Sequence, residues 1–341
     1  MALAPSIYPE FPKLMPEMNM IEAIRSALAD AMAEDERVFV LGEDVAVKGG
    51  VFLATDGLLK QYGERRVVDM PIAEAAIVGI AIGASLHGLR PVAEIQFADY
   101  IHPAIDQILN EAARFRYRSN GDWSCPIVVR APFGAGVHGG FYHSQSVEAL
   151  FASTPGIKVV APSTPYDAKG LLIAAIRDPD PVVFFEHKQL YRMQRAEVPE
   201  GSYSVPLGQA AVRRAGDDIS LYTYGLMAHF SLAAAELAAA GGISVEVIDL
   251  RTLYPLDTAA ILASVKKTGK ALIVHEDNLT GGLGGEISAL IAEHAFEYLD
   301  GPVRRLAAPD LPAVAFNDDL EAHFMLNPAK IAAALEELAA Y

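Results

Sequence analysis

The 341-residue sequence has a single cysteine and few basic residues. Cys125 cannot form an internal disulfide, so a secreted domain stabilised by disulfides is not indicated. The 27 lysine and arginine residues stand against 43 aspartate and glutamate residues, which gives a net charge of −16. Nucleic acid is therefore not expected as a partner, because phosphate binding requires a surplus of basic side chains.

A long hydrophobic run and a signal-peptide pattern are also lacking. The most apolar run, 75–86, is about 12 residues long, which is short of the ~20 that a bilayer requires, and it predicts a buried helix. Residues 1–18 are punctuated by proline and lack the basic start and apolar core of a signal peptide. We expect a cytoplasmic protein with no membrane segment.

The common phosphate and metal motifs are missing too. No GxxxxGK[ST], CxxC or HExxH occurs. The glycine cluster 281–285 does not match GxGxxG, because Glu286 and Ile287 follow where the third glycine would come. A tight turn from a strand into a helix is the expected structure there.

Hydrophobic periodicity predicts alternating strands and helices. Asn19 and Glu22 have capping-box spacing at the start of the first helix. The alternation predicts an α/β fold of two domains, each a mostly parallel sheet flanked by helices. The expected strands are 38–41, 66–70, 92–95, 127–130, 159–161, 182–185, 219–224, 244–249, 271–275 and 303–307, and the expected helices are 19–35, 73–87, 103–118, 147–153, 165–177, 227–240, 285–298 and 328–339.

The length agrees with two domains, and one segment interrupts the apolar pattern. Residues 188–206 are charged and contain proline. We therefore expect a first domain at 17–187, a linker at 188–206 and a second domain at 207–341.

Open parallel sheets bind ligands at the carboxyl ends of their strands. The residues that follow the expected strands include Glu43, Asp44, Glu74, the segment 96–100 and the loop 132–146. Each of these could also be an ordinary helix cap or turn.

The loop 132–146 is the least ordinary of these segments. Its four glycines allow a close approach of backbone to ligand, and it contains His138 and His143. Loops of this length are usually functional or disordered. A functional role is favoured for His143 over His138.

Glu74 is an acid at the first turn of the most apolar helix. It is either a carboxylate stabilised by the helix dipole or a desolvated acid that could hand a proton to a ligand nitrogen. The residues alone leave both interpretations open.

Together these segments resemble a known family, the beta subunit of the decarboxylase component of 2-oxoacid dehydrogenase complexes, which depends on thiamine diphosphate. The resemblance runs from about residue 17 to the end of the chain. Its motifs are GEDV (42–45), GGVF (49–52), PIAEAAIVG (71–79), AEIQFADYIHPAIDQI (93–108), RYRS (116–119), YHSQS (142–146), PGIKVV (155–160), TPYDAKGLL (164–172) and IDLRTLYPLD (248–257).

The resemblance implies a pyrimidine-binding domain followed by a transketolase C-terminal-like domain. It implies that Glu74 activates the cofactor by bonding a nitrogen of its aminopyrimidine ring, and that His143 serves reductive acylation of the lipoyl group. Tyr100 would pack against the aminopyrimidine with Ile72 and Gln96 nearby, and Glu43 would lie on an acidic path between two cofactor sites.

Some members of the family hold a potassium ion, mostly by main-chain oxygens. The positions that match this potassium site are Cys125, Ile127, Val128, Ala175, Asp178 and Asp180.

One departure concerns the diphosphate and its Mg²⁺, which the family's alpha subunit binds through a GDG…N motif. No GDG occurs in this sequence. The resemblance therefore implies that the chain holds half of the cofactor site. It would act as a heterotetramer of two alpha and two beta chains that delivers its product to a lipoyl-bearing acyltransferase.

The sequence leaves alternatives open for the substrate and for whether the protein is an enzyme. The motifs resemble the branched-chain 2-oxoacid type most, in branched-chain amino acid catabolism, ahead of pyruvate and acetoin enzymes. A protein that keeps the transketolase-like fold and binds nucleotides without catalysis is a further alternative. The presence of both Glu74 and His143 argues against it.

Overall fold

The computed structural model describes residues 15–341, starting shortly before helix α1 (Met20–Glu34). The capping box at this helix is confirmed: the Glu22 N–H donates to Asn19 Oδ1 at 3.0 Å, and the Asn19 N–H donates to Glu22 Oε2 at 2.9 Å. Our expectation that residues 1–18 are no signal peptide falls largely on residues 1–14, which lie outside the described residues. No helix within 15–341 is long and apolar enough to cross a membrane.

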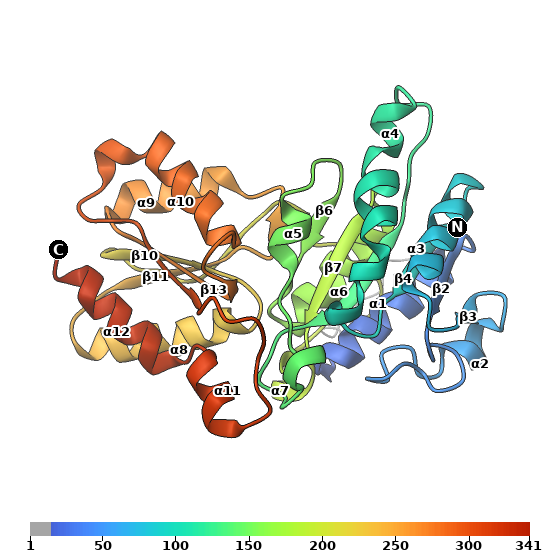
Figure 1. Ribbon diagram of the computed structural model, residues 1–341, viewed down its shortest axis with the longest axis horizontal. Helices are drawn as coiled ribbons and strands as arrows, with labels where there is room; N and C mark the ends of the chain where they lie inside the picture. Colours follow the sequence, from blue (N-terminus) through green and yellow to red (C-terminus); the bar gives the residue numbers. More distant parts are fainter. Residues whose placement is uncertain (1–14) are drawn as a thin grey trace, which may run out of the picture.

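Seven strands form the larger sheet, which lies in the lobe that contains most of the first half of the chain (Figure 1). They are β2 (Val38–Gly42), β3 (Val67–Asp69), β4 (Arg90–Glu94), β5 (Val128–Phe133), β6 (Lys158–Val160), β7 (Val182–His187) and β12 (Thr252–Tyr254). Their order is β12-β6-β7-β5-β4-β2-β3. All neighbours are parallel except β12, which comes from the second half of the chain and pairs antiparallel with β6.

Helices cover both faces of this sheet because successive strand residues point to opposite sides. Val128 and Phe184 pack with α1 and with α6 (Pro165–Arg177). Their neighbours Val129 and Phe185 pack in the other core, together with α3 (Glu74–Leu86). The sheet is therefore held between two hydrophobic cores, one on each face.

The second lobe contains a five-stranded sheet with two helices on each face (Figure 1). Its strands are β9 (Ala211–Arg214), β10 (Ile219–Thr223), β11 (Val245–Asp249), β13 (Ala271–Asn278) and β14 (Arg304–Ala308), in the order β14-β13-β10-β11-β9. Only β9 is antiparallel to its neighbour. The helices are α8 (Leu226–Ala240) and α12 (Pro328–Ala339) on one face, and α9 (Thr258–Thr268) and α10 (Leu283–His294) on the other.

The segment 188–206 folds onto the first lobe. It contains helix α7 (Leu190–Met193) and strand β8 (Ala196–Glu197), which pairs with β1 (Glu17–Met18). The buried Tyr191 hydroxyl donates to Glu186 at 2.7 Å. The domain boundaries stated above stay a prediction.

The helical stretch expected at 103–118 is present but irregular. Residues 106–111 form wide turns, in which the Ala112 N–H reaches the carbonyl of Gln107, and only α4 (Phe115–Arg118) is α-helical. The turn expected at the glycine cluster 281–285 is confirmed, because α10 begins at Leu283. The remaining short helices are α2 (Leu58–Tyr62), α5 (Glu148–Ala152) and α11 (Asp318–Phe324).

Candidate active site

The expected site residues lie at the carboxyl edge of the first sheet. Glu43 follows the end of β2, Gln96 follows β4, and the loop that carries His143 follows β5. Gln96 Nε2 lies 3.5 Å from Asp44 Oδ2. Parallel strands end at one edge, so residues far apart in sequence meet there.

Two carboxylates at this edge, Glu43 and Glu74, lie close enough for their charges to interact. Glu43 is 7% exposed, and its Oε1 has no hydrogen-bond partner among the described residues. Burial raises the pKa of Glu43, and the negative charges of Glu74 and Asp44 raise it further. Glu74, the first residue of α3, is half-buried. An unpaired buried carboxylate oxygen is costly unless a proton or a ligand donor completes it, so this pair suits a ligand with N–H groups.

Tyr100 contacts His143. It ends the single helical turn η1 (Ala98–Tyr100), and its hydroxyl lies 3.2 Å from His143 Nε2. The His143 ring is perpendicular to the rings of Phe97 and Tyr100, with centroids 4.5 and 5.6 Å away. Burial raises the pKa of Tyr100, and the nearby charges of Asp99, Glu74 and Glu43 add to this effect. Tyr100 therefore contacts His143 directly and lies within reach of the charges of Glu43 and Glu74.

The loop that carries His143 is also held by two carboxylates of the second lobe. Glu276 on β13 accepts the Ala135 N–H at 2.6 Å, and Glu321 on α11 accepts the Gly136 N–H at 3.0 Å. His138 Nδ1 lies 2.6 Å from the other Glu321 oxygen. His138 thus helps to anchor the loop. No sequence signal connects Glu276 or Glu321 to a loop so distant in the chain.

Exposed apolar side chains surround the site. Ile72 is 85% exposed and Val47 is 83% exposed, and Val51 and Leu53 are exposed as well. A group of large apolar side chains on the surface marks a contact area for another molecule. The described residues therefore form an open site beside exposed apolar side chains.

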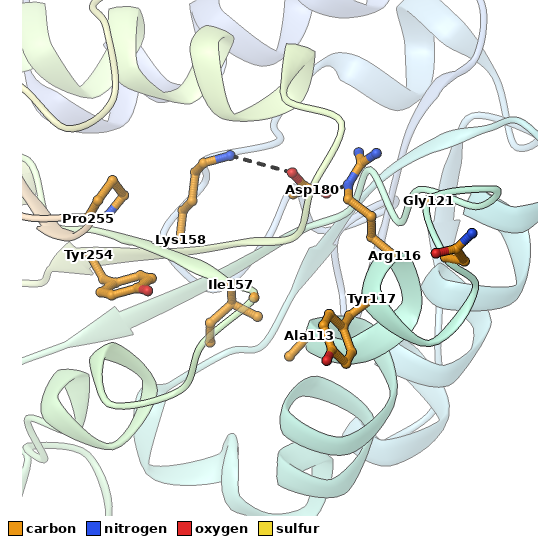
Figure 2. A pocket seen from close by; sticks show the side chains of 11 residues that line it. Ala113, Arg116, Tyr117, Gly121, Ile157, Lys158, Asp180, Tyr254 and Pro255 are labelled. Atoms are coloured by element: carbon orange, nitrogen blue, oxygen red, sulfur yellow. Dashed lines mark hydrogen bonds and ion pairs between the residues drawn. The ribbon is translucent and has the colours of Figure 1, made fainter.

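The predicted potassium positions lie at the opposite, amino edge of the same sheet. Asp178 accepts the Lys158 amine at 2.7 and 2.8 Å, and Asp180 accepts Arg116 Nε at 2.5 Å. Figure 2 shows Lys158 and Arg116 reaching Asp180 from two sides, beside a surface hollow of about 840 Å³. Both carboxylates are thus neutralised by basic side chains.

Main-chain oxygens remain for an ion at this edge. The carbonyls of Cys125 and Ile127 each accept one backbone N–H, from Ile127 and Val182, which leaves a second lone pair on each. The Asp178 carbonyl lies 3.2 Å from Arg90 Nη1. Within residues 15–341 no cluster of three or more His, Cys, Asp and Glu side chains could hold a metal ion, so the residues fit only an ion bound by carbonyls, and this site stays a prediction.

Two family models match the chain in sequence. Residues 16–194 match the transketolase pyrimidine binding domain, and residues 208–331 match the transketolase C-terminal domain.

Three relatives are similar over most of the chain. The 2-oxoisovalerate dehydrogenase subunit beta of Bacillus subtilis is 58% identical over 327 residues, which cover 96% of this chain and 100% of the relative. The pyruvate dehydrogenase E1 component subunit beta of the same organism is 53% identical over 87% of this chain and 91% of the relative. The 2-oxoisovalerate dehydrogenase subunit beta of Pseudomonas aeruginosa is 46% identical over 94% of this chain and 95% of the relative.

A solved structure confirms the fold. It is a split-gene transketolase described as an inactive beta4 tetramer, and it superimposes with a TM-score of 0.76 over 95% of this chain and 99% of that chain. The sequence identity is 23%, so this similarity speaks for the fold alone.

Proposed function

Because the chain belongs to the beta-subunit family of 2-oxoacid dehydrogenases, we propose that it decarboxylates a branched-chain 2-oxoacid together with an alpha subunit and transfers the acyl group to a lipoyl group. The observation that carries the choice of substrate is the 58% identity to a 2-oxoisovalerate dehydrogenase subunit beta along its whole length. The site supports catalysis, since Glu43, Glu74, Tyr100 and His143 come together at one sheet edge.

A pyruvate dehydrogenase is the second candidate, because a pyruvate dehydrogenase subunit beta is 53% identical. Acetoin enzymes stay a third candidate, on sequence motifs alone. The two leading substrates differ by apolar methyl groups, and an apolar pocket discriminates such differences by about 10–200-fold.

The experiment is a substrate comparison on the enzyme assembled from this chain and its alpha partner. We expect kcat/KM for 2-oxoisovalerate to exceed that for pyruvate by at least about 10-fold, measured with an artificial electron acceptor. A preference for pyruvate would assign the chain to the pyruvate enzymes. Turnover of neither substrate would overturn the proposed class of reaction.

The open site fits thiamine diphosphate, the cofactor of this family. Glu74 and the unpaired Glu43 oxygen suit an aminopyrimidine, and we propose that Tyr100, Gln96 and Ile72 contact its ring. When bound, this cofactor supplies a nucleophilic carbon and an electron sink for the loss of CO₂. We propose that the alpha subunit binds the diphosphate and Mg²⁺, since this sequence has no GDG.

We propose that two residues of this chain, Glu74 and His143, hold or transfer protons during the reaction. Glu74, at the start of α3, shares a proton between its carboxyl oxygen and a ligand nitrogen. His143, held by the Tyr100 hydroxyl, gives a proton to the sulfur that departs when the lipoyl disulfide opens. The His143 side chain is half-buried.

We propose a heterotetramer of two alpha and two beta chains, with a lipoyl-bearing acyltransferase as the next partner and the cytoplasm as the location. The exposed Ile72 and Val47 beside the site support a contact with the alpha subunit there.

We also propose a potassium ion that is bound by main-chain carbonyls at the amino edge of the first sheet. Its test is whether potassium chloride raises the unfolding temperature above that in tetramethylammonium chloride of equal ionic strength. Equal temperatures would show that Lys158, Arg116 and Arg90 suffice.

A further inference from the structure

Asp99 lies directly behind the loop that carries His143. It is 7% exposed, and its Oδ1 accepts the backbone N–H groups of Ser144 at 3.1 Å and Gln145 at 3.2 Å. These are the two residues that follow His143. A carboxylate that receives two adjacent N–H groups fixes the backbone direction of the segment.

The same short turn also holds the His143 ring. Asp99 is the middle residue of η1, and Tyr100, the last residue of that turn, meets His143 Nε2. Phe97, just before the turn, also packs against the ring, with centroids 4.5 Å apart. The segment 97–100 therefore binds the backbone of the two residues after His143 and contacts the His143 imidazole.

A buried lysine balances the charge of Asp99. Lys188 is 5% exposed, and neither its Nζ nor Asp99 Oδ2 has a hydrogen-bond partner among the described residues. Burial lowers the pKa of Lys188 to about 8, and the charges of Asp99 and Glu276 oppose that change. The Lys188 amine also lies 5.9 Å from the centroid of the Phe97 ring. Lys188 is thus the buried basic group whose charge interacts with Asp99.

We propose that Asp99 is a positioning residue for acyl transfer: its Oδ1 holds Ser144 and Gln145 so that the His143 imidazole meets Tyr100 and faces the incoming acceptor. This inference rests on the proposed function and deepens it. Asp99 itself donates no proton and contacts no substrate. Its contribution is the placement of His143, to which general acid catalysis is sensitive.

The first half of the loop has other anchors, so loss of Asp99 has a local effect. Ala135 stays bound to Glu276, and Gly136 stays bound to Glu321. A variant at Asp99 should therefore fold and assemble while residues 143–145 lose their fixed position.

The test compares Asp99→Leu and Asp99→Asn in the assembled enzyme. Asparagine keeps an acceptor oxygen, whereas leucine has a similar shape and no acceptor. We expect Asp99→Leu to reduce lipoyl acylation by about 10²-fold, within the range for loss of a general acid, and to change decarboxylation with an artificial acceptor by only a few-fold. Asp99→Asn should recover most of the acylation. Asp106→Leu, an exposed carboxylate on the next segment, is the matched control.

Hydrogen exchange supplies a readout that does not need turnover. The amides of residues 144 and 145 should exchange at least about ten times faster in Asp99→Leu than in the wild type, while the amides of 135 and 136 keep their rates. If the leucine variant fails to assemble, Asp99→Ser replaces it in the comparison with Asp99→Asn, because the shorter serine hydroxyl cannot reach the amides of residues 144 and 145.

Equal losses in both half-reactions, or an asparagine variant as damaged as the leucine variant, would overturn the inference. A wild-type enzyme that decarboxylates no 2-oxoacid would instead reject the proposed function. The two failures are therefore distinguishable.

Discussion

Glu74 and His143 occupy different kinds of position, and this difference decides how each depends on its surroundings. Glu74 begins a helix, so the hydrogen bonds of α3 fix its backbone. His143 lies on a loop whose shape depends on Asp99, Glu276 and Glu321. Substitutions around Glu74 should therefore be tolerated better than substitutions around His143.

Glu74→Gln should reduce activity by about 10²–10⁴-fold, the range expected for loss of an acid–base group, while folding stays intact. Glutamine keeps the volume but cannot share an acidic proton with a ligand nitrogen. The measurement is proton exchange at the thiazolium carbon of cofactor bound to the assembled enzyme, with the exposed Glu64→Gln as control. Near-normal exchange would make Glu74 a simple helix-start carboxylate.

His143→Ala should separate the two half-reactions. Lipoyl acylation should fall by about 10²–10⁴-fold because the proton for the departing sulfur is lost, and decarboxylation with an artificial acceptor should survive better. His87→Ala, at an exposed position, is the control. Equal loss in both assays would place His143 in the first half-reaction or in loop support.

His275 predicts a pH dependence of stability. It is fully buried against Gly282 and Gly284, and burial lowers its pKa from 6.5 to about 4. The unfolded chain binds the proton first as pH falls, so stability is complete above pH 6.5 and decreases from there toward pH 4. The loss attributable to this group is about 3 kcal/mol. His275→Leu should flatten this part of the curve in urea titrations of the full chain at each pH, and parallel curves would contradict the prediction.

At the scale of elements, local signals were predictable and distant pairings were not. The capping box of α1 lies within four residues, so sequence reasoning located that helix. The wide turns at 106–111 keep a helical hydrophobic pattern, so nothing in the sequence distinguishes them from an α-helix. Strand β12 is three residues long and pairs with a strand of the other lobe, which no local pattern reveals.

Gly134, in the loop after β5, should not tolerate a side chain. Its φ is +89°, and a Cβ there would collide with the imidazole of His187, which is hydrogen-bonded to Glu276 at 2.8 Å. Gly88 has the same φ with open space around it. Gly88→Ala should cost about 1–2 kcal/mol of unfolding free energy from backbone strain, and Gly134→Ala should cost about 1–3 kcal/mol more. Urea unfolding measures both, and equal costs would show that His187 moves aside freely.

At the scale of the whole molecule, the site was predictable only where it follows the strands of one sheet. The residues after β2, β4 and β5 could be placed at a common edge from the α/β alternation alone. The carboxylates of Glu276 and Glu321 could not, because the packing of the two lobes brings them to the loop. Asp99 lies within the segment 96–100, which the sequence analysis names as a candidate. Its contact with Ser144 could not be predicted, because it depends on how the loop 132–146 folds against that segment.

The purified chain alone should show little decarboxylase activity even with thiamine diphosphate and Mg²⁺. The sequence has no GDG, and a doubly charged diphosphate needs a metal clamp. Adding the alpha partner should restore turnover, with Glu74→Gln beta chain plus alpha as the inactive control. Substantial turnover by the beta chain alone would show that the described site is complete.

Because β12 comes late in the chain, the larger sheet cannot be completed early during synthesis on the ribosome. Until residue 254 has emerged, β6 has no partner on its outer side, and its free backbone groups form an open edge. Such an edge is a template for pairing with other chains. A fragment that stops after the first lobe should therefore aggregate more readily than the full chain, in which β12 covers β6.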